Sequence, residues 1–477
     1  MSRISSKANP AIWDVAIVGG GSAGYAAART AAKEGLKTVV IEGGDEVGGL
    51  CILRGCMPSK ALLYAAEVLH LARTAGTWGL SVPQVGFDFP AVMARKEAMV
   101  NDFAQYRRGE LVSGKFKFIR ARARFLDAHT LELDGVRQKG SPTRIQARHF
   151  ILCTGSVIAP PPLPALREAG FITSDEALSA RALPPSLIVL GGGAVATELA
   201  QFFGRFGVKV TLVQRSAHLL SGFDEDAASV LERVFRHEGM TVCAGTKLLE
   251  AFREGNEKGV ILRHRGRKMR IQAAEILLAL GRQPATAGLG LEKAGVQTES
   301  GRILASASLQ TSAPHIYAAG DCTSPHEIVH IGIEQGEIAA HNIAHPRQPK
   351  TIDYRLLTQI VFTDPQIAVV GLTEKDARQR KIPYQAASHR FPDHGKSMIM
   401  EATDGFVKLL ADPASGEILG GACAGPHGGE LIHEIIAAMY KRMTVEELAA
   451  MPHYHPTLAE IWTYPASELA ERRQARK

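Results

Sequence analysis

The sequence predicts an α/β protein in which two doubly wound, Rossmann-type nucleotide-binding domains precede a C-terminal α+β domain. Three observations support this: a strand, glycine-rich turn, helix and strand follow one another near the start of the chain, the same order recurs 172 positions later, and the last third alternates strands and helices without such a turn. A chain of 477 residues accommodates roughly two to four domains. The predicted domains are 1–158 and 283–350 for the first nucleotide site, 159–282 for the second, and 351–477 for the C-terminal domain.

The first nucleotide-binding pattern begins with the apolar run 14–18, which predicts a buried parallel strand. The glycine-rich turn 19–24, an alanine-rich helix to about residue 34 and a strand over 38–41 follow, and this strand ends in Glu42. In such a unit Gly19 allows the tight turn, Gly21 lets the backbone approach a pyrophosphate, and Gly24 allows close helix packing. Glu42 is placed to accept hydrogen bonds from a ribose. The alternative is a glycine-rich turn in an unrelated α/β domain, but the complete context favours a dinucleotide.

The second pattern superposes on the first without a gap, so that Gly191 and Gly193 occupy the positions of the first two glycines. Two differences are informative: the third glycine is replaced by Ala196, and the acid is replaced by Gln214 with Arg215 directly after it. Loss of the acid and gain of an arginine favour a 2′-phosphate, and therefore NADP(H) over NAD(H). The alternative is that Arg215 only caps a strand end at the surface.

The stretch between these patterns contains Cys51 and Cys56, which lie five positions apart. In a helix this spacing is slightly more than one turn, which brings two sulfurs close enough to bridge after a backbone adjustment. A helix entered through Gly48 and Gly49 also offers its dipole to a thiolate and lowers its pKa, and Arg54 adds a positive charge. The pattern predicts a redox-active dithiol. Two buried structural thiols are the alternative, whereas a zinc site lacks a second closely spaced pair.

Two nucleotide units around one dithiol indicate FAD together with a nicotinamide nucleotide, with electrons passing between nicotinamide, flavin and disulfide. A short strand near residue 317 ends in Gly320-Asp321, where an acid can meet the sugar-alcohol chain of a flavin; an Asx turn is the alternative. Near the C-terminus His453 and His455 precede Pro456, and Glu460 follows. A carboxylate at this distance can orient an imidazole as a base, although histidines of a surface turn are the alternative.

Composition argues against other classes of protein. The net charge of +7 is modest and scattered, so a nucleic-acid surface is not expected, and the basic tail 472–477 is predicted to be a solvated end. Among the six cysteines only the first two are close in sequence, which favours a reducing compartment over a secreted disulfide framework. The polar N-terminus 1–10 does not resemble a secretory signal, and no apolar run reaches the length of a membrane span. We expect a soluble cytoplasmic protein with no nucleic-acid or membrane partner.

These motifs together resemble the class I pyridine nucleotide–disulfide oxidoreductases, a family that includes dihydrolipoamide dehydrogenases, glutathione reductases and mercuric reductases. The resemblance covers nearly the whole chain, and the motifs occur in the order typical of the family. It implies that Cys51 exchanges with the substrate, that Cys56 faces the flavin, and that Lys60 near the flavin pairs with Glu198.

The resemblance also implies that the C-terminal domain is a dimerisation domain and that the protein is an obligate homodimer. His455 and Glu460 would then serve as a base pair for the dithiol of the partner subunit. No metal is expected. The residues predicted to hold the two cofactors are Gly19, Gly21, Ser22, Gly24, Glu42, Gly43, Gly49, Thr154, Gly155, Gly191, Gly193, Gln214, Arg215, Gly281, Arg282, Gly320 and Asp321.

Signals within the family point in different directions. The histidines and acid of 453–460 resemble dihydrolipoamide dehydrogenase, whereas the stretch from 198–201 through 215–216 and the stretch 361–366 resemble mercuric reductase. The chain has no cysteine after Cys423, where mercuric reductases carry a vicinal pair. Glutathione reductases show a second arginine and a tyrosine lid where this chain has Ser221 and Ala194. Between the redox cysteines and just before them, Leu50, Leu53 and Arg54 replace the residues usual in the family.

The leading hypothesis is therefore an FAD enzyme that moves electrons between NAD(P)H and a small, lipoyl-like disulfide. NADPH-dependent reduction of glutathione or another low-molecular-weight disulfide is the alternative, mercuric reduction is disfavoured, and a non-enzymatic flavoprotein redox sensor is the alternative from another class. The intact set of cysteines, Lys60, Glu198 and the C-terminal base argues against the sensor.

Overall fold

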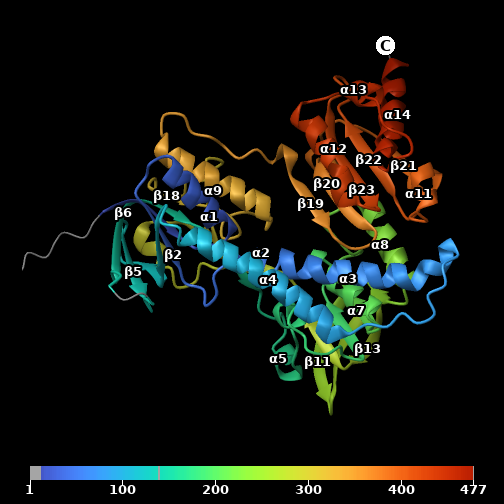
Figure 1. The fold of residues 1–477 in the computed structure, drawn as a ribbon, viewed down its shortest axis with the longest axis horizontal. Coiled ribbons are helices and arrows are strands. Elements are labelled where there is room, and N and C mark those ends of the chain that lie inside the picture. The colour runs from blue at the N-terminus through green and yellow to red at the C-terminus, as the bar shows by residue number, and fades with distance from the viewer. Residues whose placement is uncertain (1–11, 138–139, 476–477) are drawn as a thin grey trace, which may run out of the picture. The chain divides into compact units, whose positions relative to one another are not determined.

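The computed structural model describes residues 12–137 and 140–475 (Figure 1). The predicted N-terminal stretch 1–10 and the last two residues of the basic tail lie outside these ranges. The described chain forms two compact units. The first unit contains the residues up to Pro58, Glu97–Ala159 and Arg282–Asp353, and the second contains Ser59–Lys96, Pro160–Gly281 and the chain from Tyr354 onward. No helix in the described ranges is both long and apolar enough to cross a membrane.

The first unit is built on a sheet whose five parallel strands lie in the order β3, β2, β1, β6 and β18, with two antiparallel strands continuing from β6. These strands are β1 (Trp13–Val18), β2 (Thr38–Glu42), β3 (Lys117–Arg120), β4 (Arg122–Phe125), β5 (Thr130–Asp134), β6 (Arg144–Leu152) and β18 (Ile316–Ala318). Ile17 lies opposite Val40 on one side and Ile151 on the other, and all three are completely buried. The apolar runs therefore form the central parallel strands, as the sequence predicts.

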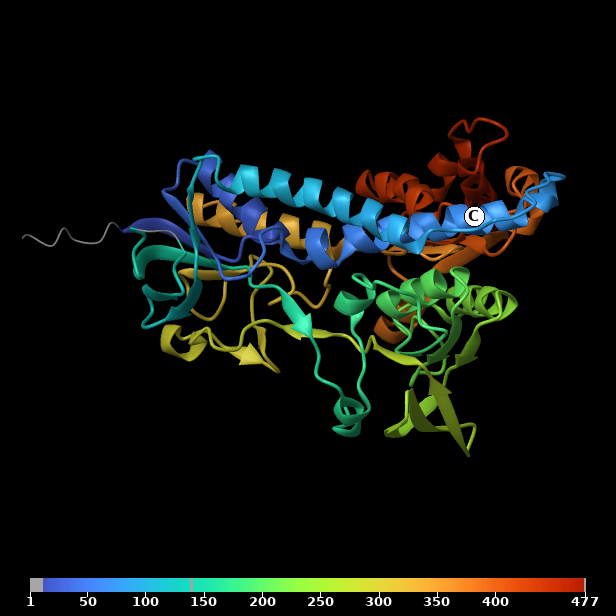
Figure 2. The same cartoon turned by 60° about the horizontal axis from the view of Figure 1, so that its bottom comes forward.

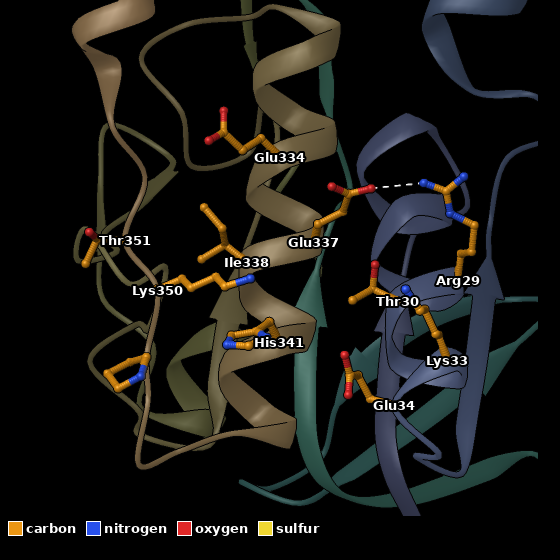
Figure 3. Close-up of a pocket in the computed structure, with 11 residues that line it drawn as sticks. Arg29, Thr30, Lys33, Glu34, Glu334, Glu337, Ile338, His341, Lys350 and Thr351 are labelled. Carbon is orange, nitrogen blue, oxygen red and sulfur yellow. Dashed lines mark hydrogen bonds and ion pairs between the residues drawn. The ribbon is translucent and has the colours of Figure 1, made fainter. Parts of the chain in front are cut away.

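Helices α1 (Ser22–Lys33) and α9 (Val329–Ala344) pack against each other in this unit, and they lie side by side in Figure 1 and Figure 2. Their contact depends on Gly336, where a Cβ atom would lie 2.3 Å from the carbonyl oxygen of Ala23. An ion pair of 3.0 Å joins Arg29 to Glu337 across the two helices (Figure 3). A segment near residue 330 thus completes the layer formed by the first nucleotide-binding helix.

The long helix α4 (Phe89–Leu111) occupies part of the stretch 76–150, in which the sequence pattern indicates turns and mixed strands instead. Its apolar side chains are not gathered on one face, and Phe103 and Tyr106 are 41 % and 68 % exposed. An amphipathic pattern is the main helix signal in a sequence, so a helix without one escapes detection.

The second unit contains a parallel sheet, an antiparallel C-terminal sheet and a three-stranded antiparallel layer. The parallel sheet has the order β10, β9, β8, β14, and the antiparallel C-terminal sheet has the order β19, β20, β23, β22, β21. Their strands are β8 (Ser186–Leu190), β9 (Lys209–Val213), β10 (Thr241–Cys243), β14 (Glu275–Leu278), β19 (Thr358–Val361), β20 (Gln366–Gly371), β21 (Gln385–Arg390), β22 (Phe406–Ala411) and β23 (Ile418–Gly425). The antiparallel layer comprises β11 (Thr246–Glu254), β12 (Glu257–His264) and β13 (Arg267–Ala273).

The helices around these sheets are α3 (Cys56–Thr74), α5 (Ala165–Ala169), α6 (Ser174–Ala177), α7 (Ala194–Arg205), α8 (Glu225–His237), α10 (Glu374–Arg380), α11 (Gly395–Ile399), α12 (Gly428–Tyr440), α13 (Val445–Ala450) and α14 (Thr463–Gln474). Short strands β7 (Ser156–Ile158) and β15 (Arg282–Pro284) pair in the first unit, as do β16 (Thr298–Glu299) and β17 (Arg302–Ile303). The C-terminal segment is thus an α+β layer, as predicted, and Trp462 is buried in its core.

Candidate active site and cofactor sites

The two redox cysteines lie on successive helices rather than on one. Helix α2 (Gly49–Arg54) ends at Gly55, and α3 begins at Cys56. A Cβ atom on Gly55 would lie 3.0 Å from the carbonyl oxygen of Leu50 and 3.1 Å from the Cα atom of Cys51, so the break packs tightly against the preceding turn. This break supplies the backbone adjustment that a disulfide between positions five apart requires.

Both cysteines are free thiols in the structure. The hydrogen bond to Cys56 raises the pKa of Cys51 far above its usual range, and burial raises it further. The sequence analysis expects a lowered pKa from the helix dipole, and for Cys51 this expectation is wrong because the neighbouring sulfur dominates. Cys51 is consequently held as a protonated thiol, and a base is needed before it can attack a disulfide.

The cation that acts on Cys51 is also different from the one predicted. Arg54 is half-exposed and forms an ion pair of 2.5 Å with Glu46. Arg107 of α4 instead provides the positive charge that opposes the rise in the pKa of Cys51. The sequence gives no signal for this contact, because Arg107 comes from a helix that the apolar pattern does not reveal.

The first glycine-rich turn forms a cradle around Glu42. The amide of Gly20 donates to Oε2 of Glu42 at 2.8 Å, and the amide of Gly44 donates to Oε1 at 2.6 Å. Beside it, a Cβ atom on Gly49 would lie 2.7 Å from the Cα atom of Gly21. A carboxylate at the end of β2 and two facing glycines without side chains fit the ribose and pyrophosphate of a dinucleotide.

Asp321 follows the end of β18 and belongs to a hydrogen-bonded group of three side chains. The hydroxyl of Ser156 donates to Oδ2 of Asp321 at 2.7 Å, and Nε of Arg282 donates to the same hydroxyl at 2.8 Å. The structure therefore brings together Asp321 and Arg282, two predicted residues, through Ser156, which the sequence analysis does not single out. Gly155 and Gly320 flank this group with positive φ angles of 72° and 77°.

Gly24→Ala is expected to destabilise the first unit and to weaken cofactor retention. A Cβ atom at Gly24 would lie 1.8 Å from the carbonyl oxygen of Gly19, so α1 would have to move away from the turn. We expect a loss of about 1–3 kcal/mol in the free energy of unfolding, with a lower content of bound flavin. Thermal melts and the ratio of flavin to protein absorbance measure both effects.

Gly109→Ala is the matched control, because a Cβ atom at Gly109 would have no neighbour within 4 Å and the residue lies within α4. This variant should melt at the same temperature or slightly higher. An unchanged melting temperature and flavin content in Gly24→Ala would contradict the proposed close approach of α1 to the turn.

The second glycine-rich turn has the same geometry but a different acid position. A Cβ atom on Gly191 would lie 2.2 Å from the carbonyl oxygen of Ala279, which explains its positive φ of 129°. Gln214 accepts a hydrogen bond of 2.9 Å from the amide of Arg215 through its own Oε1. Arg215 is exposed and follows the end of β9. Like Gly191, Gly281 has a positive φ, of 108°.

Lys60 and Glu198 form an ion pair of 2.8 Å, with Glu198 nearly completely buried. The second carboxylate oxygen accepts from the amide of Phe362 at 2.9 Å, and Nζ of Lys60 lies 4.6 Å from the Phe362 ring centroid. Gln201, on the same helix as Glu198, donates to the carbonyl oxygen of Asp364 at 2.6 Å and accepts from the amide of Asp364 at 2.7 Å. The two stretches that resemble mercuric reductase are therefore in direct contact, although they are separated by more than 150 positions in the sequence.

His455 and Glu460 form the hydrogen-bonded pair that the sequence predicts. Nδ1 of His455 lies 3.0 Å from Oε2 of Glu460, the carboxylate is buried, and the imidazole is 77 % exposed. His453, by contrast, is buried and binds Oε1 of Glu434 through Nε2 at 2.6 Å. The two neighbouring histidines thus differ: His455 offers its ring to solvent, and His453 is fixed inside the domain.

His394 is a further member of this group that the sequence analysis missed. Its buried ring places Nε2 3.4 Å from Oε1 of Glu460, and Nδ1 lies 2.8 Å from the hydroxyl of Ser397. Burial lowers the pKa of His394, which favours the neutral ring. The dithiol belongs to the first unit, whereas Lys60, Glu198, His455 and Glu460 belong to the second.

Comparisons with known proteins agree with this chemistry. Residues 13–344 match the family described as pyridine nucleotide-disulphide oxidoreductase, and residues 357–466 match the dimerisation domain of the same family. A mercuric reductase of Streptomyces lividans is 34% identical over 451 residues, which cover 94% of each chain. A dihydrolipoyl dehydrogenase of Geobacillus stearothermophilus is 34% identical over 459 residues, covering 95% of each chain.

Two solved structures share the fold over nearly their whole length. LpdA of Mycobacterium tuberculosis superposes with a TM-score of 0.85 at 28% identity, covering 95% of this chain and 99% of its own. The HOCl-induced flavoprotein disulfide reductase RclA of Escherichia coli gives 0.83 at 26% identity, with the same coverage. The chain belongs to the pyridine nucleotide-disulphide oxidoreductase family, as an FAD-dependent enzyme that moves electrons between a pyridine nucleotide and a disulfide.

Proposed function

We propose that this enzyme transfers electrons between NAD(P)H and a lipoyl-type disulfide through Cys51 and Cys56. The observation that carries the proposal is the hydrogen bond of 3.0 Å between His455 and Glu460, which presents an oriented and solvent-facing imidazole. Relatives named dihydrolipoyl dehydrogenase, at 31–34% identity over more than nine-tenths of this chain, support a dithiol substrate of that kind.

In the oxidation of a dithiol, His455 accepts the proton of the first substrate thiol. The resulting thiolate attacks the sulfur of Cys51, the bond between Cys51 and Cys56 breaks, and Cys56 leaves as a thiolate. The second substrate thiol then attacks the first substrate sulfur, the mixed disulfide breaks, and Cys51 leaves and takes up the proton of that second thiol, while His455 keeps the first proton. The substrate leaves as a disulfide, and the electron pair remains on the two cysteines. The turn 19–24, Glu42 and Asp321 would hold FAD, which would supply the two-electron chemistry that links the dithiol to the nicotinamide.

The match to a dimerisation domain over 357–466 includes both His455 and Glu460. The proposal therefore includes a homodimer in which this base pair serves the dithiol of the partner subunit. FAD is assigned to the turn 19–24 with Glu42 and Asp321, and the nicotinamide nucleotide is assigned to the β8–α7–β9 unit. A reducing cytoplasmic location is proposed because only the redox pair is close in sequence among six free cysteines.

The nucleotide preference gives a separate prediction. The double substitution Gln214→Glu with Arg215→Leu is expected to lower kcat/KM for NADP⁺ about tenfold or more and to raise it for NAD⁺. It restores the acid that binds a ribose 2′-hydroxyl and removes the cation that pairs with a 2′-phosphate. The ratio of the two kcat/KM values measures the effect. An unchanged ratio would show that Arg215 only caps a strand at the surface.

The test of the function is turnover of purified enzyme with dihydrolipoamide and with dihydrolipoate, each in the presence of NAD⁺ and NADP⁺. Rapid reduction of either nucleotide supports the proposal. Absence of turnover with all four combinations, while NADPH still reduces the flavin, would overturn the lipoyl assignment. It would favour the second candidate, reduction of another small disulfide by NADPH, for which the exposed Arg215 is the supporting observation.

A further inference from the structure

Arg107 is a cation whose hydrogen-bonding capacity is incompletely used. Its Nε and Nη1 atoms are buried and have no hydrogen-bond partner among the described residues. The guanidinium instead lies 4.2 Å from the centroid of the Tyr25 ring. Stacking on an aromatic ring compensates only part of the loss of hydration, so a half-buried guanidinium with two buried nitrogens that lack acceptors is costly in free energy.

The nearby acids are engaged elsewhere. Oε2 of Glu110 accepts a hydrogen bond of 2.8 Å from the Tyr25 hydroxyl and lies 3.4 Å from Nζ of Lys115. Arg29 also lies 6.0 Å from the centroid of the Tyr25 ring and is paired with Glu337. Burial lowers the pKa of Arg107, but a guanidinium remains charged at neutral pH. Its positive charge is therefore available to a ligand.

This charge lies close to the sulfur that meets the substrate in the proposed function. Arg107 and Cys51 interact electrostatically, and the interaction favours the thiolate. We propose that Arg107 binds an acidic group of the disulfide substrate, so that the enzyme prefers small disulfides that carry a carboxylate over neutral amides. A guanidinium matches a carboxylate in charge and geometry. The proposal rests on the proposed role of Cys51 as the substrate-facing thiol.

Alkylation of the reduced enzyme tests this without a substrate. Iodoacetate and iodoacetamide react alike, since the Cys51 sulfur forms a thioether and iodide leaves, but only iodoacetate carries a carboxylate. Trypsin cleaves after Arg54 and separates Cys51 from Cys56, so mass spectrometry assigns the product. In Arg107→Met the ratio of the iodoacetate rate to the iodoacetamide rate should fall about tenfold. Arg108→Met, at the exposed neighbour, should keep it within twofold.

Other outcomes are decisive. If Arg107→Met lowers the alkylation rates of iodoacetate and iodoacetamide equally, Arg107 acts on the Cys51 thiolate alone. If neither rate changes, Arg107 acts on neither the thiolate nor the carboxylate of the reagent. Either result overturns the proposal. Arg107→Lys should retain most of the preference for iodoacetate, because it keeps the positive charge. This variant separates the loss of charge from misfolding. The flavin content of Arg107→Met should match the wild type, and a loss of flavin would overturn the proposal by placing Arg107 at the cofactor.

Turnover separates this inference from the proposed function. The wild type should favour dihydrolipoate over dihydrolipoamide, and Arg107→Met should lose about tenfold in kcat/KM for the acid while the amide stays within threefold. If neither dithiol is oxidised but the alkylation ratio still falls, the anion site stands and the lipoyl assignment fails. If both are oxidised and Arg107→Met changes them equally, the anion site fails and the lipoyl assignment stands.

A second, independent observation lies where α1 meets α9. His341 and His345 are one helical turn apart on α9, and Glu34 follows the end of α1. Each offers a ligand atom, and these atoms all lie within 4.8 Å of one another, with Nε2 of His345 2.9 Å from Oε2 of Glu34. Figure 3 shows Glu34 and His341 on the two neighbouring helices. We infer that two imidazoles and a carboxylate here bind a divalent cation of the zinc type.

Zinc titration of the oxidised enzyme by calorimetry tests this site, because the closed Cys51–Cys56 disulfide does not compete for the metal. One equivalent should bind, and His341→Ala or His345→Ala should weaken that binding at least about tenfold. His237→Ala, an exposed histidine at the end of α8, should leave it unchanged. Binding that is insensitive to the first two substitutions would overturn the inference.

Discussion

Cys51→Ser is expected to abolish electron transfer to and from disulfides while leaving the flavin bound and reducible. The serine hydroxyl cannot form the mixed disulfide, so turnover should fall by at least about 10³-fold. Cys51 lies on α2, and its thiol contacts Cys56 rather than supporting the fold, so the protein should remain folded. Anaerobic stopped-flow with NADPH should show flavin reduction within about threefold of the wild-type rate.

Cys243→Ala is the control for this experiment. Cys243 is buried on β10 in the second unit, and its thiol has no part in the proposed reaction. Its turnover should stay within about threefold of wild type. Disulfide turnover that survives in Cys51→Ser would show that electrons leave the enzyme by another route and would remove the basis of the proposed mechanism.

Local patterns in the sequence predicted the scaffold well. The strands and helix of the first nucleotide unit end within one or two residues of the predicted positions, because buried apolar runs and glycine turns are encoded by adjacent residues. The dithiol, too, was found from its spacing. The backbone adjustment that this spacing requires is the helix break at Gly55, which packs against Leu50.

Long-range contacts were harder to predict. Arg107 acts on Cys51 from α4, and this helix has no clear apolar face that a sequence could reveal. The sequence therefore favoured Arg54, which lies between the two cysteines, as the cation. Ser156 joins Asp321 to Arg282 only after three distant segments meet. Neither contact leaves a periodic or spaced signal in one sequence, because each depends on the fold that positions the partners.

His394 illustrates how such a contact changes the chemistry of a predicted residue. A protonated His394 beside Glu460 would offset the charge of the carboxylate and weaken the hydrogen bond between Glu460 and His455. Burial disfavours that protonation, so the carboxylate remains available to fix the orientation of the exposed ring. The environment of Glu460 therefore favours a base at His455, and the strength of that base is open to direct measurement.

His455→Gln is expected to slow the dithiol half-reaction by about 10²–10³-fold, the range typical of a lost general base. The effect should be large because the base removes the proton of the first substrate thiol, and the thiolate is the attacking species. Reduction of the flavin by NADPH should stay within about threefold, since it uses no proton from this ring. Rapid mixing of oxidised enzyme with dihydrolipoamide, and separately of enzyme with NADPH, measures the two half-reactions.

Two further variants sharpen this prediction. His453→Gln should lower the melting temperature, because it breaks the buried contact with Glu434, but should leave the dithiol half-reaction within about threefold. Glu460→Gln should give an intermediate loss of about 10–10²-fold, since the base remains but is poorly oriented. Raising the pH should recover part of the rate lost in His455→Gln, because the substrate thiols then ionise without a base. Equal slowing of both half-reactions in His455→Gln would show that His455 supports the structure and does not act as the base.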